Sequence, residues 1–297
     1  MIRHVEEDAA LDPPIRPKKC LNCKICNTFQ FTYRIPTLRE LFDRDKRLLR
    51  AILSIAIRVN VPIGRYILCP FVLFSTWIHE LFHGMAALSV GGSIEWLNIY
   101  PDGSGLAYTN IPDAMFQRAW VAAAGYQGTA VVGGIMLMFR RTNVGVRIVT
   151  GGIGLAMLLT CVLFVRNAFG LAVLLMMGIL ITFAGWYLPL FWVGELYALL
   201  AATTCLNAIT SIQVLFFVTE SSIGGVSQSS DAMTMQEVTM VRYQLWALIW
   251  LVLAFWMTAM GVFLVFEAQD KGLREDTGRN LDMDTFHEDR PLTTELT

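Results

Sequence analysis

The stretch FVLFSTWIHELFHGMAALSV, residues 71–90, places ionisable side chains inside a segment that is apolar enough to enter a membrane. His79, Glu80 and His83 lie within five consecutive residues of it. A charge at the centre of a membrane helix costs roughly 2.5 to 3.5 kcal/mol on insertion scales. Three such groups so close together therefore predict a compensating metal ion or a water-filled cavity.

The spacing of the two histidines is typical of a metal site. Residues four apart on a helix lie on one face, one turn apart, so the imidazoles of His79 and His83 can reach the same ion. In a His-Glu-x-x-His pattern the glutamate acts as general base on a water bound to zinc. Zinc lowers the pKa of that water from about 15.7 toward about 7. We therefore expect His79 and His83 to bind Zn²⁺ and Glu80 to be catalytic. The alternative is a chance occurrence of the pattern in a helix.

The composition of the whole chain indicates a membrane protein. Hydrophobic residues make up 55% of the 297 residues and charged residues only 16%, whereas a soluble domain carries about 25% charged residues. Most charges lie before Arg58 or after Phe266. A span needs roughly 20 apolar residues, and by this measure six spans are predicted. They lie near residues 66–90, 119–139, 146–165, 168–188, 190–217 and 243–266.

Two segments between the spans are not apolar. In residues 91–113, Asp102-Gly103 and Gly105 separate two strand-like runs, which predicts a β-hairpin with Asp102 as a turn residue. Residues 218–242 are predicted to be a polar loop.

The predicted fold is an all-α polytopic membrane bundle of about six transmembrane helices, with a small β-hairpin after the HExxH helix. Its expected parts are a polar cytoplasmic tail (1–46), an interfacial amphipathic helix (47–60), the membrane domain (61–267) and a polar C-terminal tail (268–297).

Basic residues predict the orientation of the bundle. Thirteen lysines and arginines precede the first span, and Arg140, Arg141 and Arg147 follow the second. The excess of basic residues on cytoplasmic loops then predicts that both termini are cytoplasmic. The hairpin and the 218–242 loop are expected to share the opposite side.

The N-terminal tail carries Cys20, Cys23 and Cys26 in a CxxCxxC pattern. A structural zinc site needs four ligands, and no fourth is obvious, so a solvated tail is the first interpretation. A small metal site and palmitoylation are the alternatives. The net charge of −1 gives no indication of a nucleic-acid partner, and no motif predicts an organic cofactor.

Four motifs resemble a known family: HELFHG (79–84), GGSI (91–94), PDGSG (101–105) and AAGYQG (123–128). Together they resemble the site-2-protease-like intramembrane zinc metallopeptidases, and among these the B-like branch. The resemblance covers about residues 70–135, and SSDA at 229–232 resembles a later family signature.

This resemblance implies an activity and a role for each residue of the motif. His79 and His83 would bind zinc, and Glu80 would be the catalytic acid and base. The hairpin would hold an unfolded segment of substrate by strand addition. The implied activity is the hydrolysis of peptide bonds in membrane-associated protein substrates, within or beside the lipid bilayer.

The third zinc ligand is where the sequence departs from the family. Site-2 proteases have an aspartate in a later membrane helix, but here Asn207 is followed by Val214 where that aspartate would stand. We expect Asp231 to be the third ligand, because the charge bias puts it on the same side as the outer end of the HExxH helix. Glu195, a carboxylate inside an apolar run, is the alternative. Asn207 or a water molecule could also complete the shell.

A hypothesis from another class stays open at this point. The chain could be a non-catalytic membrane protein, either transporter-like or scaffolding, with a structural or absent metal. A catalytic site keeps an open coordination position, whereas a structural zinc site is closed by four protein ligands.

Overall fold

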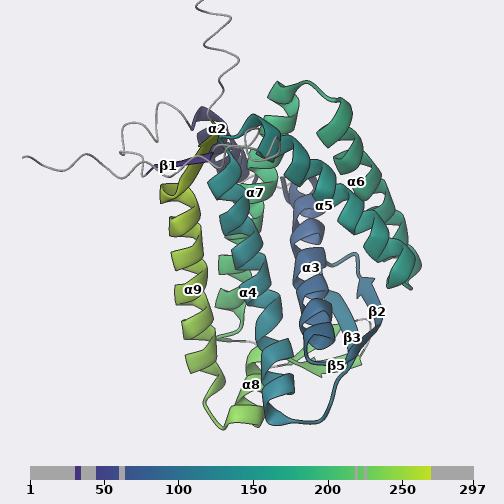
Figure 1. Cartoon of the computed structure of the whole chain (residues 1–297). Helices are drawn as coiled ribbons and strands as arrows, with labels where there is room; N and C mark the ends of the chain where they lie inside the picture. Colours follow the sequence, from purple (N-terminus) through teal and green to yellow (C-terminus); the bar gives the residue numbers. More distant parts are fainter. Residues whose placement is uncertain (1–30, 35–44, 60–63, 218–219, 224–225, 269–297) are drawn as a thin grey trace, which may run out of the picture. The chain divides into compact units, whose positions relative to one another are not determined.

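The computed structural model describes residues 31–34, 45–59, 64–217, 220–223 and 226–268 (Figure 1). The described helices are α2 (Lys46–Val59), α3 (Gly64–Ser89), α4 (Met115–Phe139), α5 (Asn143–Leu163), α6 (Ala168–Tyr187), α7 (Leu190–Val214), α8 (Asp231–Thr239) and α9 (Tyr243–Phe263). The described strands are β1 (Phe31–Arg34), β2 (Ser93–Ile99), β3 (Gly105–Asn110), β4 (Glu220–Ile223), β5 (Val226–Ser229) and β6 (Val265–Ala268). The Cys20–Cys26 motif and the tail from residue 269 lie outside the described residues.

Each of the six predicted spans is a long helix, and the predicted membrane bundle is confirmed. Among the described residues, α4, α5, α6, α7 and α9 are long and apolar enough to cross a membrane by length and composition. The HExxH helix α3 is not among these five, because its histidines and glutamate lower its hydropathy.

The outer surface of the bundle is apolar, as expected for contact with lipid. Leu159 on α5, Leu180 on α6 and Val252 on α9 are each more than half exposed. An apolar surface this extensive is unusual on a soluble monomer. The sides of α5, α6 and α9 are therefore suited to a membrane.

The predicted hairpin is present after α3. Strands β2 and β3 pair antiparallel, and the turn between them contains Gly103 at a φ of +90°. The side chain of Asp102 accepts hydrogen bonds from the backbone N–H of Ser104 at 3.0 Å and from its hydroxyl at 2.6 Å. These bonds hold the pKa of the Asp102 carboxyl below its usual value. The prediction that Asp102 is a turn residue is confirmed.

One edge of this hairpin is occupied and the other faces a cavity. The N–H of Leu97 on β2 donates to the carbonyl of Phe164, in the α5–α6 connection, at 2.9 Å. The amide of Asn167 donates to the carbonyl of Ile99 at 2.5 Å and accepts from its N–H at 3.3 Å. The α5–α6 connection therefore covers the outer edge of β2, whereas Ala107 on β3 lines the cavity described below.

The segment predicted to be a polar loop is more ordered than expected. It contains the β4–β5 hairpin and α8. The hydroxyl of Ser230 caps the start of α8 by accepting a hydrogen bond from the N–H of Met233 at 3.4 Å. Ala232 and Met235 are buried in a cluster that includes Trp250 of α9. This packing places α8 against α4 and α9 (Figure 1).

Strands β1 and β6 form a pairing that was also not predicted. They pair antiparallel, from Phe31 opposite Ala268 to Arg34 opposite Val265. Part of the predicted N-terminal tail is therefore hydrogen-bonded to the residues that follow α9.

Candidate metal centre

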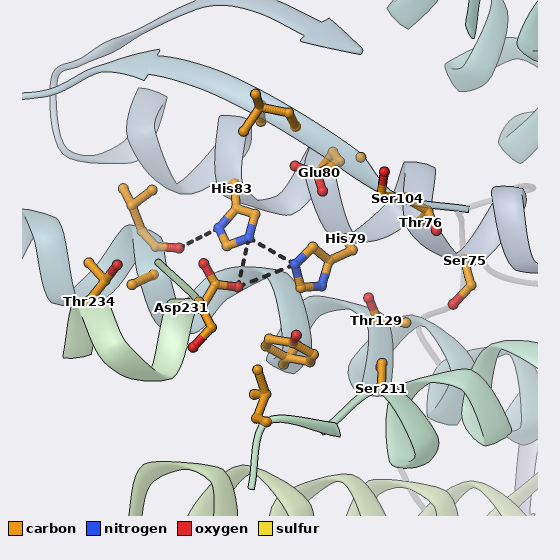
Figure 2. A pocket seen from close by; sticks show the side chains of 18 of the residues that line it. Ser75, Thr76, His79, Glu80, His83, Ser104, Thr129, Ser211, Asp231 and Thr234 are labelled. Atoms are coloured by element: carbon orange, nitrogen blue, oxygen red, sulfur yellow. Dashed lines mark hydrogen bonds and ion pairs between the residues drawn. The ribbon is translucent and has the colours of Figure 1, made fainter. Parts of the chain in front are cut away.

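Three side chains converge on one point beside α3 (Figure 2). The Nε2 atoms of His79 and His83 lie 3.0 Å apart. The Oδ2 atom of Asp231 lies 3.3 Å from each of them. In the part of the chain that the structure describes, His79, His83 and Asp231 form a group whose ligand atoms are close enough to hold one metal ion. Two imidazoles and a carboxylate are the ligand types that zinc takes in catalytic sites.

The orientation of His83 is set by its other ring nitrogen. Nδ1 of His83 donates to the backbone carbonyl of Val121 on α4 at 2.7 Å, because a carbonyl can only accept. In a neutral imidazole this bond would leave the lone pair of Nε2 free for an ion, whereas without an ion a protonated His83 donates from Nε2 to Asp231. Metal-binding histidines are commonly oriented by a bond of this kind.

Two glycines of α4 allow it to approach the histidines closely. A Cβ atom added at Gly125 would meet Nε2 of His83, and would lie 2.6 Å from Nε2 of His79. A Cβ at Gly128 would collide with the ring of Phe82 on α3. These glycines let α3 and α4 pack closely, and at Gly125 the space is next to the metal-ligand atoms themselves.

Asp231 is held at the start of α8. It is the first residue of that helix, directly after the capping Ser230, where the free N–H groups stabilise a carboxylate. Burial alone would raise the pKa of its carboxyl, but the charge of His83 and the hydrogen bonds to both imidazoles hold it well below its usual range. The carboxylate is therefore ionised and available as a ligand at neutral pH.

Glu80 lies on the side of α3 that faces the hairpin. Its residue is 6% exposed, and a Cβ atom added at Gly105 would lie 2.8 Å from its Oε1. The hydroxyl of Thr76, one turn earlier on α3, donates to the carbonyl of Gly103 at 2.7 Å and fixes the hairpin there. Glu80 is thus enclosed between α3 and β3, next in sequence to a histidine of the metal centre.

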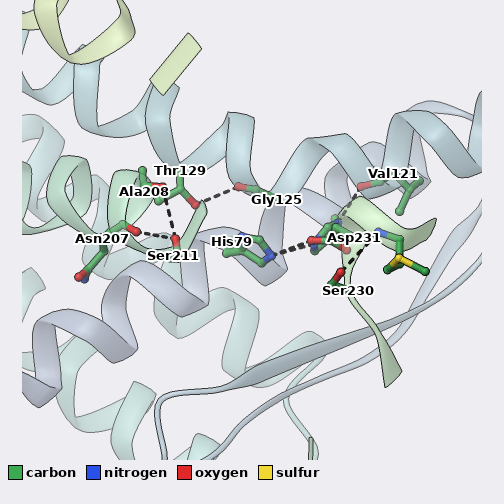
Figure 3. Close-up of polar contacts among 11 residues, drawn as sticks. His79, Val121, Gly125, Thr129, Asn207, Ala208, Ser211, Ser230 and Asp231 are labelled. Carbon is green, nitrogen blue, oxygen red and sulfur yellow. Dashed lines mark hydrogen bonds and ion pairs between the residues drawn. The ribbon is translucent and has the colours of Figure 1, made fainter. Parts of the chain in front are cut away.

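All of these residues line one cavity of about 890 Å³. Its walls come from α3, the hairpin, α4, the end of α7 and the start of α8. Polar groups of α4 and α7 lie beside His79 (Figure 3). The hydroxyl of Thr129 donates to the carbonyl of Gly125 at 2.9 Å, and the buried Nδ2 of Asn207 has no hydrogen-bond partner among the described residues. Asn207 therefore lines the cavity with an amide whose donor is buried and unpaired among the described residues.

The alternative ligand Glu195 does not belong to this site. It is near the start of α7, where it forms ion pairs with Arg50 and Arg47. Asn207, which does line the cavity, is twelve residues further along the same helix, or about 18 Å at the rise of an α-helix.

The sequence predicted His79, Glu80, His83 and Asp231, and the structure brings all four to the same cavity. The sequence did not predict the role of Val121. This residue binds His83 through its backbone carbonyl, which every residue type has, so its side chain gives no signal. The sequence also did not predict Tyr126, whose ring lies edge-on to His79 with centroids 4.5 Å apart and is stacked on Trp250. The GYQG motif contains this tyrosine and was the only signal for it.

A family model described as Peptidase M50B-like matches residues 49–261, which include the whole cavity. No curated protein and no solved structure matches the chain significantly.

Proposed function

Since the chain belongs to the M50B-like peptidase family, we propose that it is a zinc metallopeptidase that hydrolyses peptide bonds in membrane-associated proteins. Family membership and the five apolar helices make it a multi-pass integral membrane protein. The observation that carries the proposal is the convergence of His79, His83 and Asp231 in a cavity that also contains Glu80.

The residues present fit a zinc ion. Nε2 of His79, Nε2 of His83 and Oδ2 of Asp231 would hold it, and the Val121 carbonyl keeps His83 in the required tautomer. Zinc, when bound, lowers the pKa of a coordinated water and polarises a carbonyl group. Gly125 leaves space beside the ligand atoms, and the Cβ atom of any other residue would fill that space.

Glu80 is proposed as the group that moves the proton. Its carboxylate would accept a proton from the attacking water and pass it to the amide nitrogen of the leaving segment, as a general base and then a general acid. The hairpin covers Glu80, which is 6% exposed, while leaving it on the wall of the cavity that contains the metal centre.

The substrate is proposed to be an extended segment of a membrane-associated protein. The outer edge of β2 is occupied by the α5–α6 connection, while β3 lines the cavity. An extended chain could therefore add to β3 and pass over the metal centre. Strand addition uses backbone hydrogen bonds, so it tolerates varied side chains but requires an unfolded segment.

A non-catalytic protein with a structural metal is less consistent with this site. A closed structural zinc site needs four protein ligands. The described residues supply three, and these line a cavity of about 890 Å³.

The test is the Glu80→Gln variant, purified in parallel with wild type and loaded with zinc. Glutamine has nearly the same volume but cannot accept a proton, so zinc content should be unchanged while proteolysis is lost. Cleavage is measured on an unfolded soluble protein (casein) and on a single-span membrane protein in the same vesicles. Glu237→Gln, at an exposed position of α8, is the control and should cleave like wild type. Cleavage by Glu80→Gln at the wild-type rate would refute the enzymatic proposal.

A further inference from the structure

A second cavity, of about 410 Å³, lies where α2, the end of α4 and the start of α7 meet. It is separate from the metal centre, because none of its lining residues lines the first cavity. Its charged lining residues are Asp45, Lys46, Arg47, Arg50, Arg140 and Arg141.

Positive charge is in excess around this cavity. Five of its lining side chains are cationic and one is a carboxylate, Asp45. A second carboxylate, Glu195, pairs with Arg50 and Arg47 at its edge. Two carboxylates therefore face five cations among the described residues, which favours an anionic ligand.

The cavity is built on a buried ion cluster. Asp45 is shared by two guanidinium groups, each at 2.8 Å. Arg140 directs its other hydrogen bonds to backbone carbonyls, those of Leu137 and Gly261 at 2.7 Å and that of Val262 at 2.8 Å. These carbonyls are neutral, so they orient the guanidinium without cancelling its charge. The Nε of Arg140 remains buried without a partner among the described residues.

The backbone of two helices adds to the positive potential. Asn143 is the first residue of α5 and Phe191 the second of α7, and both line the cavity. Neither helix has an acidic residue in its first turn or a side-chain cap. Free N–H groups at helix starts favour anions, and phosphate in particular.

A glycine in α7, Gly194, leaves room for the side chain of Arg47. A Cβ atom added at Gly194 would lie 2.8 Å from Cζ of Arg47. Glycine at this position allows the Arg47 guanidinium to lie flat against α7, at the wall of the cavity.

The surroundings of the cavity match the level of lipid headgroups. Trp186, Tyr187 and Trp192, next to the start of α7, are each more than half exposed, and such aromatic side chains gather at the membrane–water boundary. On α2, Leu48 is buried against the bundle while Ile52 and Leu53 are exposed. An amphipathic helix with apolar side chains outward beside basic ones is typical of the membrane interface.

We propose that this cavity binds the phosphate group of an anionic phospholipid. Basic pockets between membrane helices commonly take such headgroups. The acyl chains would lie along the apolar outer surface of α2 and α7. Binding would link α2, which already packs on the bundle, to the membrane at the same point. This inference does not depend on the metal centre being catalytic.

The test compares wild type with two opposite charge changes at the cavity. Dissociation constants for phosphatidylglycerol are measured by native mass spectrometry of the full chain. Arg47→Gln removes a cation and should weaken binding about fivefold, the effect of one basic residue near a lipid surface. Glu195→Gln removes a competing carboxylate and should strengthen binding by a similar factor.

Two controls separate this site from general charge effects and from free phosphate. Arg147→Gln, on α5 but outside the cavity, should bind the lipid like wild type. Inorganic phosphate, added to the protein in phosphatidylcholine nanodiscs, should raise the melting temperature less than phosphatidylglycerol does. Equal lipid affinity in all the variants would overturn the proposal. Equal stabilisation by free phosphate would overturn the assignment to a lipid.

Discussion

Asp231 shows how much of the metal centre depends on one side chain outside the HExxH motif. Two histidines on a single helix turn leave a zinc ion short of protein ligands. Asp231 comes from a segment almost 150 residues later in the chain, and it is brought within 3.3 Å of both imidazoles by the capped start of α8.

We therefore expect Asp231→Ala to lose zinc nearly as completely as His83→Ala. Loss of a residue behind a metal ligand weakens binding about 10- to 100-fold, so loss of a ligand should exceed about 100-fold. Zinc content after dialysis against a weak chelator is the measurement. Glu195→Ala is the matched carboxylate control, and should retain the metal. Retention of zinc by Asp231→Ala would mean that another group completes the shell.

Asp45 is a residue whose effect on stability depends on pH. Burial raises the pKa of its carboxyl, but hydrogen bonds from Arg141 and Arg140 and their charges outweigh burial, and the pKa lies below its usual value of 3.8. A lowered pKa in the folded state means that the ion cluster stabilises the fold above about pH 4. This stabilisation is lost as the pH falls through the folded-state value.

We expect Asp45→Asn to destabilise the protein by about 3 kcal/mol at neutral pH, since it leaves buried guanidinium charge uncompensated. The difference in melting temperature from wild type should narrow as the pH is lowered below about 4. Asp113→Asn, at a carboxylate that is 94% exposed, should differ little from wild type throughout. A difference that does not change with pH would show that the Asp45 charge is not the cause.

At the level of secondary structure, hydrophobicity predicted most of the fold. The six spans and the hairpin were predicted because their signals are local: apolar length for the helices, and Asp102-Gly103 for the turn. The helix α8 was missed, because its nine residues are only weakly apolar and it packs Ala232 and Met235 into a cluster with Trp250. Such packing partners are distant in sequence and leave no local pattern.

The same reasoning applies to the site. His79, Glu80 and His83 form a local motif, so the sequence alone predicts them. Predicting Asp231 as a ligand required two further arguments: that it lies on the same side of the membrane as the end of the HExxH helix, and that SSDA resembles a family signature. The bond from His83 to the Val121 carbonyl depends on the crossing of α3 and α4, which no single-sequence pattern encodes.

The hairpin gives a prediction about substrate handling. Asn167 binds the backbone of Ile99 through both polar atoms of its amide, so Asn167→Ala should loosen β2 without touching the metal ligands. Zinc content should be unchanged, while KM for an extended substrate should rise severalfold. Asn110→Ala, at an exposed position of β3, is the control and should leave KM as in wild type. Loss of zinc from Asn167→Ala would contradict this separation of roles.

At the scale of the whole molecule, the two cavities lie toward opposite ends of α7. The hairpin and α8 are at the end of the bundle with the metal centre, whereas α2 is at the other (Figure 1). The excess of basic residues near α2 predicts that this end of the bundle faces the cytoplasm.

This orientation can be tested with single cysteines in a variant whose six native cysteines are replaced. Cysteines at Lys46 and Asn143 should react with an impermeant maleimide from the cytoplasmic side of sealed vesicles. Cysteines at Asp102 and Glu237 should react only from the opposite side. Labelling of the Asn143 and Asp102 positions from the same side would show that the predicted number of spans is wrong.

The pairing of β1 with β6 indicates whether the number of membrane crossings is even or odd. Residues 31–34 and 265–268 are hydrogen-bonded to each other, so the chain enters and leaves the folded body at the same face of the membrane. A path that begins and ends on one face must cross an even number of times. The five helices identified by length and hydropathy make an odd number, and α3 supplies the sixth crossing. An even number of crossings therefore predicts that α3, the helix with the two histidines, also traverses the bilayer, although α3 is not among the five most apolar helices.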